Sequence, residues 1–329
     1  MGRKMIADTA DTFTYPRIGR IDRRSPALDA LIAPDAKIEK LAEGFIWAEG
    51  PVWIDEGPYL YFSDVPANKM YRWSETRDLS LYLSPSGYEG NDPLAFREPG
   101  TNGLIRGPGH SILMADQGNR AIAHFDLDTR TKRFLATQYE GRRFNSPNDL
   151  VRASNGTIYF TDPPYGLEGL NDSPLKELPF NGVYRLDPDG SVTLLESGLS
   201  FPNGILLSPD ERTLYVANSD PRRAIIMAYA LDPAGNIVGR RRFVDLTPLV
   251  GPDRPGVPDG MAIDRAGNLF ATGPGGIWVF TPDGLSLGLI ATGNEIANCA
   301  FGDADGATLY IASHTMIARV RTRTRGLGF

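Results

Sequence analysis

Short apolar runs recur along the chain, and the clearest of them form one repeated set. Each run is rich in tyrosine, phenylalanine, isoleucine or leucine and ends in a small or polar residue. The six runs are Tyr59–Asp64, Ser111–Asp116, Thr157–Asp162, Thr213–Asn218, Asn268–Gly273 and Thr308–Ser313. Runs of this length and composition, bounded by turn residues, predict β-strands rather than helices.

A second signature lies 14 or 15 residues before the end of each of these runs. It is a polar residue that opens another apolar run. The six polar residues are Glu49, Asn102, Asn148, Asn203, Asp259 and Asn298. Their mean spacing is about 50 residues, which is typical of the blades of a β-propeller.

Two further apolar runs follow in most units, with turn sequences such as Asp187-Pro-Asp-Gly190 between them. The pattern therefore predicts an all-β fold, a six-bladed β-propeller with four strands in each blade. The last unit has only three strands, so we expect Lys37–Ala42 to pair beside Ile317–Val320 and close the ring. Residues 1–36 would form an N-terminal extension, and residues 37–329 the catalytic propeller domain.

In a propeller the first strand of each blade lines the central channel, so the six polar residues should converge on one axis. Two carboxylates and several amide oxygens suit a hard divalent cation. The other interpretation is a water-filled channel in which these groups bond to each other. Asp149, next to Asn148, should point away from the channel.

The second strands run antiparallel to the first, so the residues that follow them should ring the same mouth. Such a mouth would have the polar and titratable groups that a binding site needs. The residues expected there are Asp64, Gln117, Asp162, Tyr165, Asn218, Asp220 and His314.

Five motifs in register resemble the regucalcin/gluconolactonase family of propeller lactonases. They are Glu49-Gly-Pro-Val-Trp53, Ser146-Pro-Asn-Asp-Leu150, Phe160-Thr-Asp162, Phe201-Pro-Asn-Gly-Ile205 and Pro258-Asp-Gly-Met261. The resemblance implies one divalent cation at the channel mouth and hydrolysis of a sugar lactone such as gluconolactone. Its ligands would be Glu49, Asn148, Asn203 and Asp259. We expect calcium, with zinc, manganese, magnesium or iron as alternatives.

The motifs are more specific for the family than for the substrate. Animal members have an arginine at the position of Ser146 that contacts substrate, so the preferred lactone is open. The loop Pro163–Phe180 should overhang the mouth and contribute to selection, or else be a passive surface loop. The expected substrate-binding residues are Asn102, Asn148, Tyr165, Gln117 and His314.

Hydrolysis of a lactone needs a polarised carbonyl, an activated water and a stabilised oxyanion. A divalent cation supplies the first and third, and Asp259 is our candidate general base. Alternatively, Asp259 is only a ligand and His314 is the base. The chain has no Gly-x-Ser-x-Gly motif, which argues against a serine esterase. Two other functions stay open: a related hydrolase of the phosphotriesterase type and a non-enzymatic calcium-binding propeller.

Composition narrows the partners and the location. The formal net charge is −6, so nucleic acid is not an expected partner. No apolar run is long enough for a membrane-spanning helix. The single cysteine, Cys299, rules out a disulfide framework. Without an apolar signal segment we expect a cytoplasmic protein, with a periplasmic location left open. The expected partner is a small-molecule lactone, and the oligomeric state is unknown.

Overall fold

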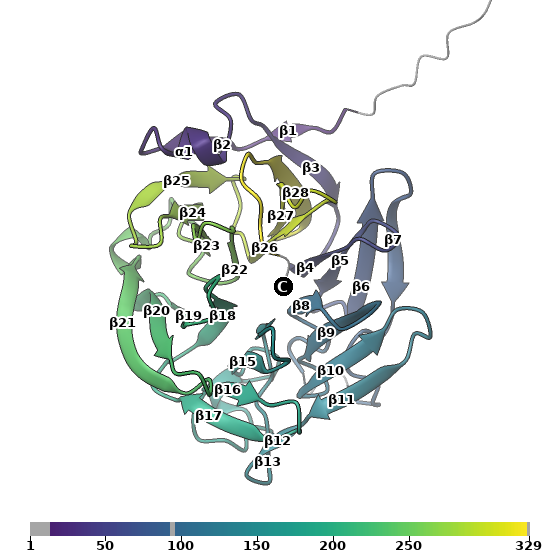
Figure 1. The fold of residues 1–329 in the computed structure, drawn as a ribbon. Coiled ribbons are helices and arrows are strands. Elements are labelled where there is room, and N and C mark those ends of the chain that lie inside the picture. Colours follow the sequence, from purple (N-terminus) through teal and green to yellow (C-terminus); the bar gives the residue numbers. More distant parts are fainter. Residues whose placement is uncertain (1–13, 93–95, 328–329) are drawn as a thin grey trace, which may run out of the picture.

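A computed structural model of the chain describes residues 14–92 and 96–327. Six antiparallel sheets stand around a central axis, and the first strand of each sheet lies nearest that axis (Figure 1). This arrangement confirms the predicted six-bladed propeller. The sheets follow the chain in order, so successive blades are neighbours around the ring.

In the first three blades the strands follow the chain from the axis outward. Blade one has β4 (Ala48–Ile54), β5 (Tyr59–Asp64), β6 (Lys69–Ser74) and β7 (Asp78–Leu83). Blade two has β8 (Leu104–Arg106), β9 (Ser111–Asp116), β10 (Ala121–Asp126) and β11 (Lys132–Ala136). Blade three has β14 (Leu150–Arg152), β15 (Ile158–Asp162), β16 (Gly182–Leu186) and β17 (Val192–Glu196).

The other three blades also begin at the axis, and N-terminal strands complete the last two on the outside. Blade four has β18 (Pro202–Leu207), β19 (Thr213–Asp220), β20 (Arg223–Leu231) and β21 (Ile237–Asp245). Blade five has β22 (Met261–Ile263), β23 (Leu269–Gly273), β24 (Gly276–Phe280), β25 (Ser286–Ala291) and β2 (Arg20–Arg23). Blade six has β26 (Asn298–Gly302), β27 (Thr308–Ser313), β28 (Met316–Arg321), β3 (Ile38–Glu43) and β1 (Arg17–Ile18).

The ring closes through the N-terminal part of the chain, as predicted. Strand β3 pairs antiparallel with β28, with Ile38 opposite Val320 and Ala42 opposite Ile317. Strands β1 and β2 extend blades six and five at their outer edges, which the sequence pattern did not predict. The boundary between an extension and the propeller at residue 36 stays a prediction, and residues 1–13 lie outside the described part.

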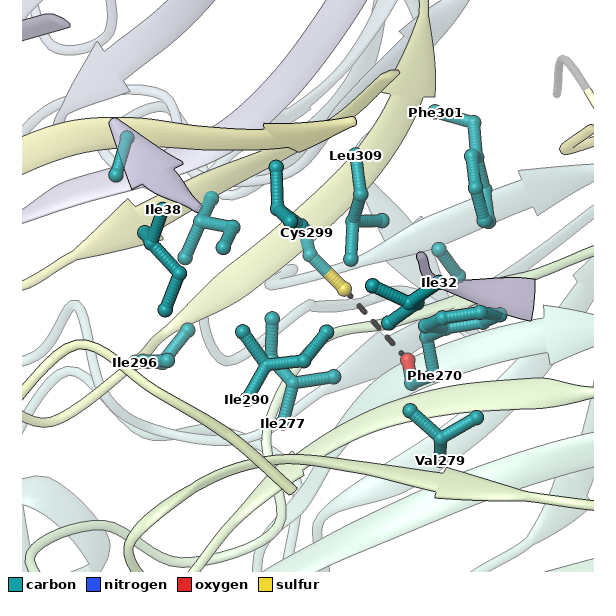
Figure 2. Close-up of a cluster of buried hydrophobic side chains, with 14 of the residues drawn as sticks. Ile32, Ile38, Phe270, Ile277, Val279, Ile290, Ile296, Cys299, Phe301 and Leu309 are labelled. Atoms are coloured by element: carbon teal, nitrogen blue, oxygen red, sulfur yellow. Dashed lines mark hydrogen bonds between the residues drawn. The ribbon is translucent and has the colours of Figure 1, made fainter. Parts of the chain in front are cut away.

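Apolar side chains fill the spaces between neighbouring blades. Figure 2 shows the cluster between blades five and six, where Phe270 and Leu309 come from the two sheets. Ile32 and Ile38 join the same cluster from the N-terminal part, so ring closure is also a core contact. Cys299 is buried there, and its thiol donates to the carbonyl oxygen of Phe270 at 3.6 Å.

Arg319 ties the closing strand to its neighbours. Its guanidinium lies 2.9 Å from Glu39 on β3 and 2.6 Å from Glu75 after β6. The same group lies over the rings of Tyr15 and Trp73. These contacts join blades one and six beside the closing strand β3.

Near the axis the first strands approach each other so closely that glycine is required. A Cβ added to Gly204 would lie 2.1 Å from the carbonyl oxygen of Asp259 on the next blade. Gly50 has φ +53, and a Cβ there would lie 2.2 Å from the carbonyl oxygen of Asn102. Because neighbouring backbones touch, the residues that open these strands are held at one mouth.

The channel widens toward the opposite face into a cavity of about 290 Å³. Its wall includes Asp55 in the turn after β4 and Arg106 at the end of β8, together with Arg325–Leu327 near the C-terminus. Backbone hydrogen bonds from Gly326 and Leu327 to Gly306 and Ile263 hold that segment across blades five and six. Within the described ranges, no helix is long and apolar enough to cross a membrane.

Candidate functional site

Glu49 opens the innermost strand of blade one and is 2% exposed. Its Oε2 accepts hydrogen bonds from the backbone N–H of Gly50 at 2.6 Å and from Asn298 Nδ2 at 3.1 Å. Burial, with a smaller contribution from the nearby Asp149, raises the pKa of Glu49 from 4.5 to about 8, against the lowering effect of these two donors. Asn298 therefore acts as a support for Glu49.

Asp259 precedes the innermost strand of blade five. Its backbone N–H donates to Thr272 Oγ1 at 3.0 Å, which fixes the main chain. Its Oδ1 is buried and has no hydrogen-bond partner among the described residues. Burial raises the pKa of Asp259 well above 3.8, and the charge of Glu49 is the next cause. A buried carboxylate oxygen without a partner is costly, so this position needs a proton or a cation.

Asn148 and Asn203 open the first strands of blades three and four and are 3% and 5% exposed. Thr161 connects their backbones. Its carbonyl oxygen accepts from the N–H of Asn148, and its hydroxyl donates to the carbonyl oxygen of Asn203 at 2.7 Å. Neither side chain makes a hydrogen bond to another residue in 14–92 or 96–327, so both amides are available to a ligand.

The donor chemistry of this mouth fits a hard divalent cation. The negative charges of Glu49 and Asp259 repel each other, so a cation bound between them would stabilise both ionised carboxylates. The two free amides, Asn148 and Asn203, can add neutral oxygen ligands. In the described part of the chain no three His, Cys, Asp or Glu side chains gather as a metal site. Any cation here would therefore depend on the amide oxygens. The ligand roles of Glu49, Asn148, Asn203 and Asp259 stay predictions.

A chain of three side chains lies on the blade-two side of the mouth. Asn102 Nδ2 donates to Gln117 Oε1 at 3.0 Å, and Gln117 Nε2 donates to Glu98 Oε2 at 2.8 Å. Burial raises the pKa of Glu98, and neighbouring Arg97 lowers it. Both Asn102 and Gln117 were predicted substrate-binding residues, whereas Glu98 was not.

Tyr165 and His314 have different surroundings. The ring of Tyr165 stacks on Phe201 with centroids 5.6 Å apart, and burial followed by the charge of Asp259 raises its pKa. His314 is an exposed residue in the β27–β28 turn, edge-on to Trp47 at 5.4 Å. Its charge acts on Glu295, whose pKa it lowers against the larger effect of burial. The substrate roles proposed for both residues stay predictions.

Other polar residues predicted for the mouth bind the backbone that builds it. Both carboxylate oxygens of Asp64 accept from the N–H of Ile46, and Oδ1 also accepts from Trp47. Asp162 Oδ2 accepts from the N–H of Asn145 at 2.7 Å, and burial raises the pKa of Asp162 to about 7. These contacts give structural roles to both aspartates.

The expectation for Asp149 was wrong. Its side chain lines the channel cavity, where it accepts from the N–H groups of Leu150 at 2.9 Å and Ile205 at 3.3 Å. It thereby links the first strands of blades three and four. Burial raises the pKa of Asp149 to about 7. Sequence reasoning also missed Glu98 and Glu295, whose charges raise the pKa of Asp259.

Known proteins share this architecture and are similar to this chain in sequence. The family described as SMP-30/gluconolactonase/LRE-like region matches residues 47–315. A gluconolactonase from Zymomonas mobilis is 47% identical over 313 residues, which cover 94% of this chain and 88% of that protein. A pentonolactonase from Haloferax volcanii is 28% identical, over 80% of each chain. A solved gluconolactonase from Xanthomonas campestris superposes with a TM-score of 0.79 at 32% identity, covering 95% of this chain and 99% of that one.

Proposed function

Because the chain belongs to the SMP-30/gluconolactonase/LRE-like family, we propose that it hydrolyses a sugar lactone at the channel mouth in a divalent-cation-dependent reaction. The lactonase activity follows from the 47% identity to a gluconolactonase over nearly the whole chain. The metal dependence and the location of the site are our own inferences. The buried, unpartnered Oδ1 of Asp259 carries them.

Four residues would hold the cation: Glu49, Asn148, Asn203 and Asp259. Calcium suits this set best because all donors are hard oxygens. When bound, the cation supplies Lewis acidity to the carbonyl and to the oxyanion that forms on it. Glu49 neutralises part of its charge and is held in place by Asn298.

Asp259 acts as the general base in this proposal. Its carboxylate takes one proton from a water molecule while the water oxygen bonds to the lactone carbonyl carbon. The bond between that carbon and the ring oxygen then breaks, and the proton on Asp259 passes to the ring oxygen. The products are a hydroxyl group and a carboxylic acid, which ionises at neutral pH. In the cation-free protein, burial and then the charge of Glu49 raise the pKa of Asp259 well above 3.8, whereas a bound cation would favour the ionised form that accepts the proton.

The test compares D259N with E49Q, assayed with gluconolactone at rising calcium after the metal has been stripped. Both variants remove one negative charge from the site, but only D259N removes the proposed base. We expect D259N to lose roughly 100-fold or more in kcat at saturating calcium, whereas added calcium rescues E49Q better. Equal recovery of both variants would reduce Asp259 to a ligand. Full wild-type turnover in excess chelator would refute the cation dependence.

A further inference from the structure

The mouth contains a carboxylate, Glu98, that the proposed reaction does not use. It comes from the segment between blades one and two, and its side chain is 13% exposed. Its backbone N–H donates to the carbonyl oxygen of Gly166 at 3.4 Å, which joins this segment to the loop Pro163–Phe180. Glu98 is thus held between two loops on the rim of the proposed site.

Glu98 determines how the Gln117 amide lies. An ionised carboxylate only accepts hydrogen bonds, so Gln117 must turn its NH2 group toward it. Gln117 Nε2 donates to Glu98 Oε2 at 2.8 Å and to the backbone oxygen of Glu98 at 3.3 Å. Gln117 is completely buried, and a Cβ added to Gly166 would lie 2.5 Å from its Cγ. Close packing therefore restricts the Gln117 side chain to this position, and its Oε1 faces Asn102.

Gln117 in turn determines how the Asn102 amide lies. Gln117 Oε1 is an acceptor, so Asn102 must offer Nδ2 to it, at 3.0 Å. The Asn102 backbone is fixed on both sides, since its N–H donates to the carbonyl oxygen of Ala115 and its carbonyl accepts from Ser63 Oγ. Asn102 Oδ1 makes no hydrogen bond within residues 14–92 and 96–327. It is the group left for a ligand.

We propose that Glu98 is a positioning residue that acts through Gln117 to present the side-chain oxygen of Asn102, and not its NH2 group, to the substrate. Blade two then offers an acceptor, so the substrate group bound there is a donor, such as a hydroxyl of the sugar lactone. This inference rests on the proposed lactonase function at the same mouth. It assigns selection of a hydroxyl-bearing substrate to a residue that does not contact the substrate itself.

The test is a double-mutant cycle on gluconolactone hydrolysis. E98L removes the acceptor, and we expect KM to rise about 5- to 100-fold, the usual effect of losing a hydrogen-bond partner in a buried site, with a smaller change in kcat. E98Q can still present an oxygen to Gln117, so its KM should stay within about threefold of the wild type. In the N102A background, E98L should cause no further rise in KM, because the effect passes through Asn102.

Two controls separate the possible failures. E140L and E140Q make the same changes at an exposed glutamate of the hairpin Gln138–Arg143 and should leave KM unaltered. If E98L is poorly folded, Q117L breaks the same chain at its centre and should show the same non-additivity with N102A. The proposal would be overturned if the rises in KM caused by E98L and N102A multiply in the double variant. It would also be overturned if E98Q raises KM as much as E98L does. An inactive wild type would instead reject the lactonase function.

Discussion

In the cation-free state, the free energy of unfolding of this protein should fall as the pH rises toward 8. In the cation-free protein Glu49 is buried with its pKa raised from 4.5 to about 8. The folded state then binds the proton more tightly than the unfolded chain does. The contribution of this bound proton to the free energy of unfolding is complete below pH 4.5 and is lost as the pH rises through about 8.

The size of the effect follows from the same shift. The rise from 4.5 to about 8, at about 1.4 kcal/mol for each pH unit, gives a loss of about 5 kcal/mol in the free energy of unfolding. Glu49 and Asp259 interact, so this loss belongs to the pair rather than to either carboxylate alone. Calcium at 100 times its dissociation constant should restore about 2.7 kcal/mol at pH 8.

Urea denaturation of the metal-stripped protein between pH 5 and pH 8 measures this slope. Other buried acids also contribute, including Asp149 and Asp162, whose pKa values are raised to about 7. The informative quantity is therefore the difference between wild type and E49Q, because glutamine keeps an acceptor for Gly50 and does not titrate. E168Q, at an exposed site, should follow the wild type. Equal slopes for wild type and a folded E49Q would refute the reasoning.

Three further predictions concern the fold. R319M removes a guanidinium shared by two carboxylates and should lower the free energy of unfolding by about 1–3 kcal/mol. The control is R240M, at a side chain that is 71% exposed, and it should change the free energy of unfolding by less than about 0.5 kcal/mol. Urea denaturation measures both variants. G204A should cost about 2 kcal/mol or more, because the added Cβ meets backbone at 2.1 Å; G239A, whose nearest neighbour is at 3.6 Å, is the control. Cys299 should resist thiol reagents in the native protein and react fully in denaturant, because it is buried and burial raises its pKa; rapid labelling of the native state would contradict the packing in Figure 2.

The second strand of each blade could be predicted because it is buried on both faces along nearly its whole length. Such strands are nearly continuous apolar runs, as in β9 and β27, which are buried throughout. The outer strands carry a weaker signal. Strand β21, for example, includes three consecutive exposed arginines, Arg240–Arg242, which interrupt its apolar pattern.

The short N-terminal strands were missed for a related reason. Strand β2 is Arg20–Arg23, with three charged residues out of four, and no residue of it is fully buried. Its pairing depends on the free edge of β25 rather than on its own apolarity. A single-sequence pattern contains no information about which edge stays free, so only the closing strand β3 could be placed.

Part of the site was predictable because the repeat itself marks the axis. The polar residues that open the first strands stand out against apolar neighbours, and the channel geometry gives them a common location. Glu98 and Glu295 have no such context, since they lie in irregular segments. Both come shortly before the polar residue that opens a first strand, Asn102 or Asn298. That position on the mouth side of the ring is the signal that could have identified them.

The distribution of positive charge distinguishes the axial carboxylates from those on the rim. On the rim, Glu98 has Arg97 beside it and Glu295 has His314, and each of these basic side chains lowers the pKa of its partner. On the axis, the pKa values of Glu49 and Asp259 are set mainly by burial, by hydrogen-bond donors and by other carboxylates. No cationic side chain is among these largest causes. Two buried acids without a counter-charge are costly to a folded protein. The absence of a cationic side chain beside these two acids supports the proposal that a cation from solution supplies the missing charge.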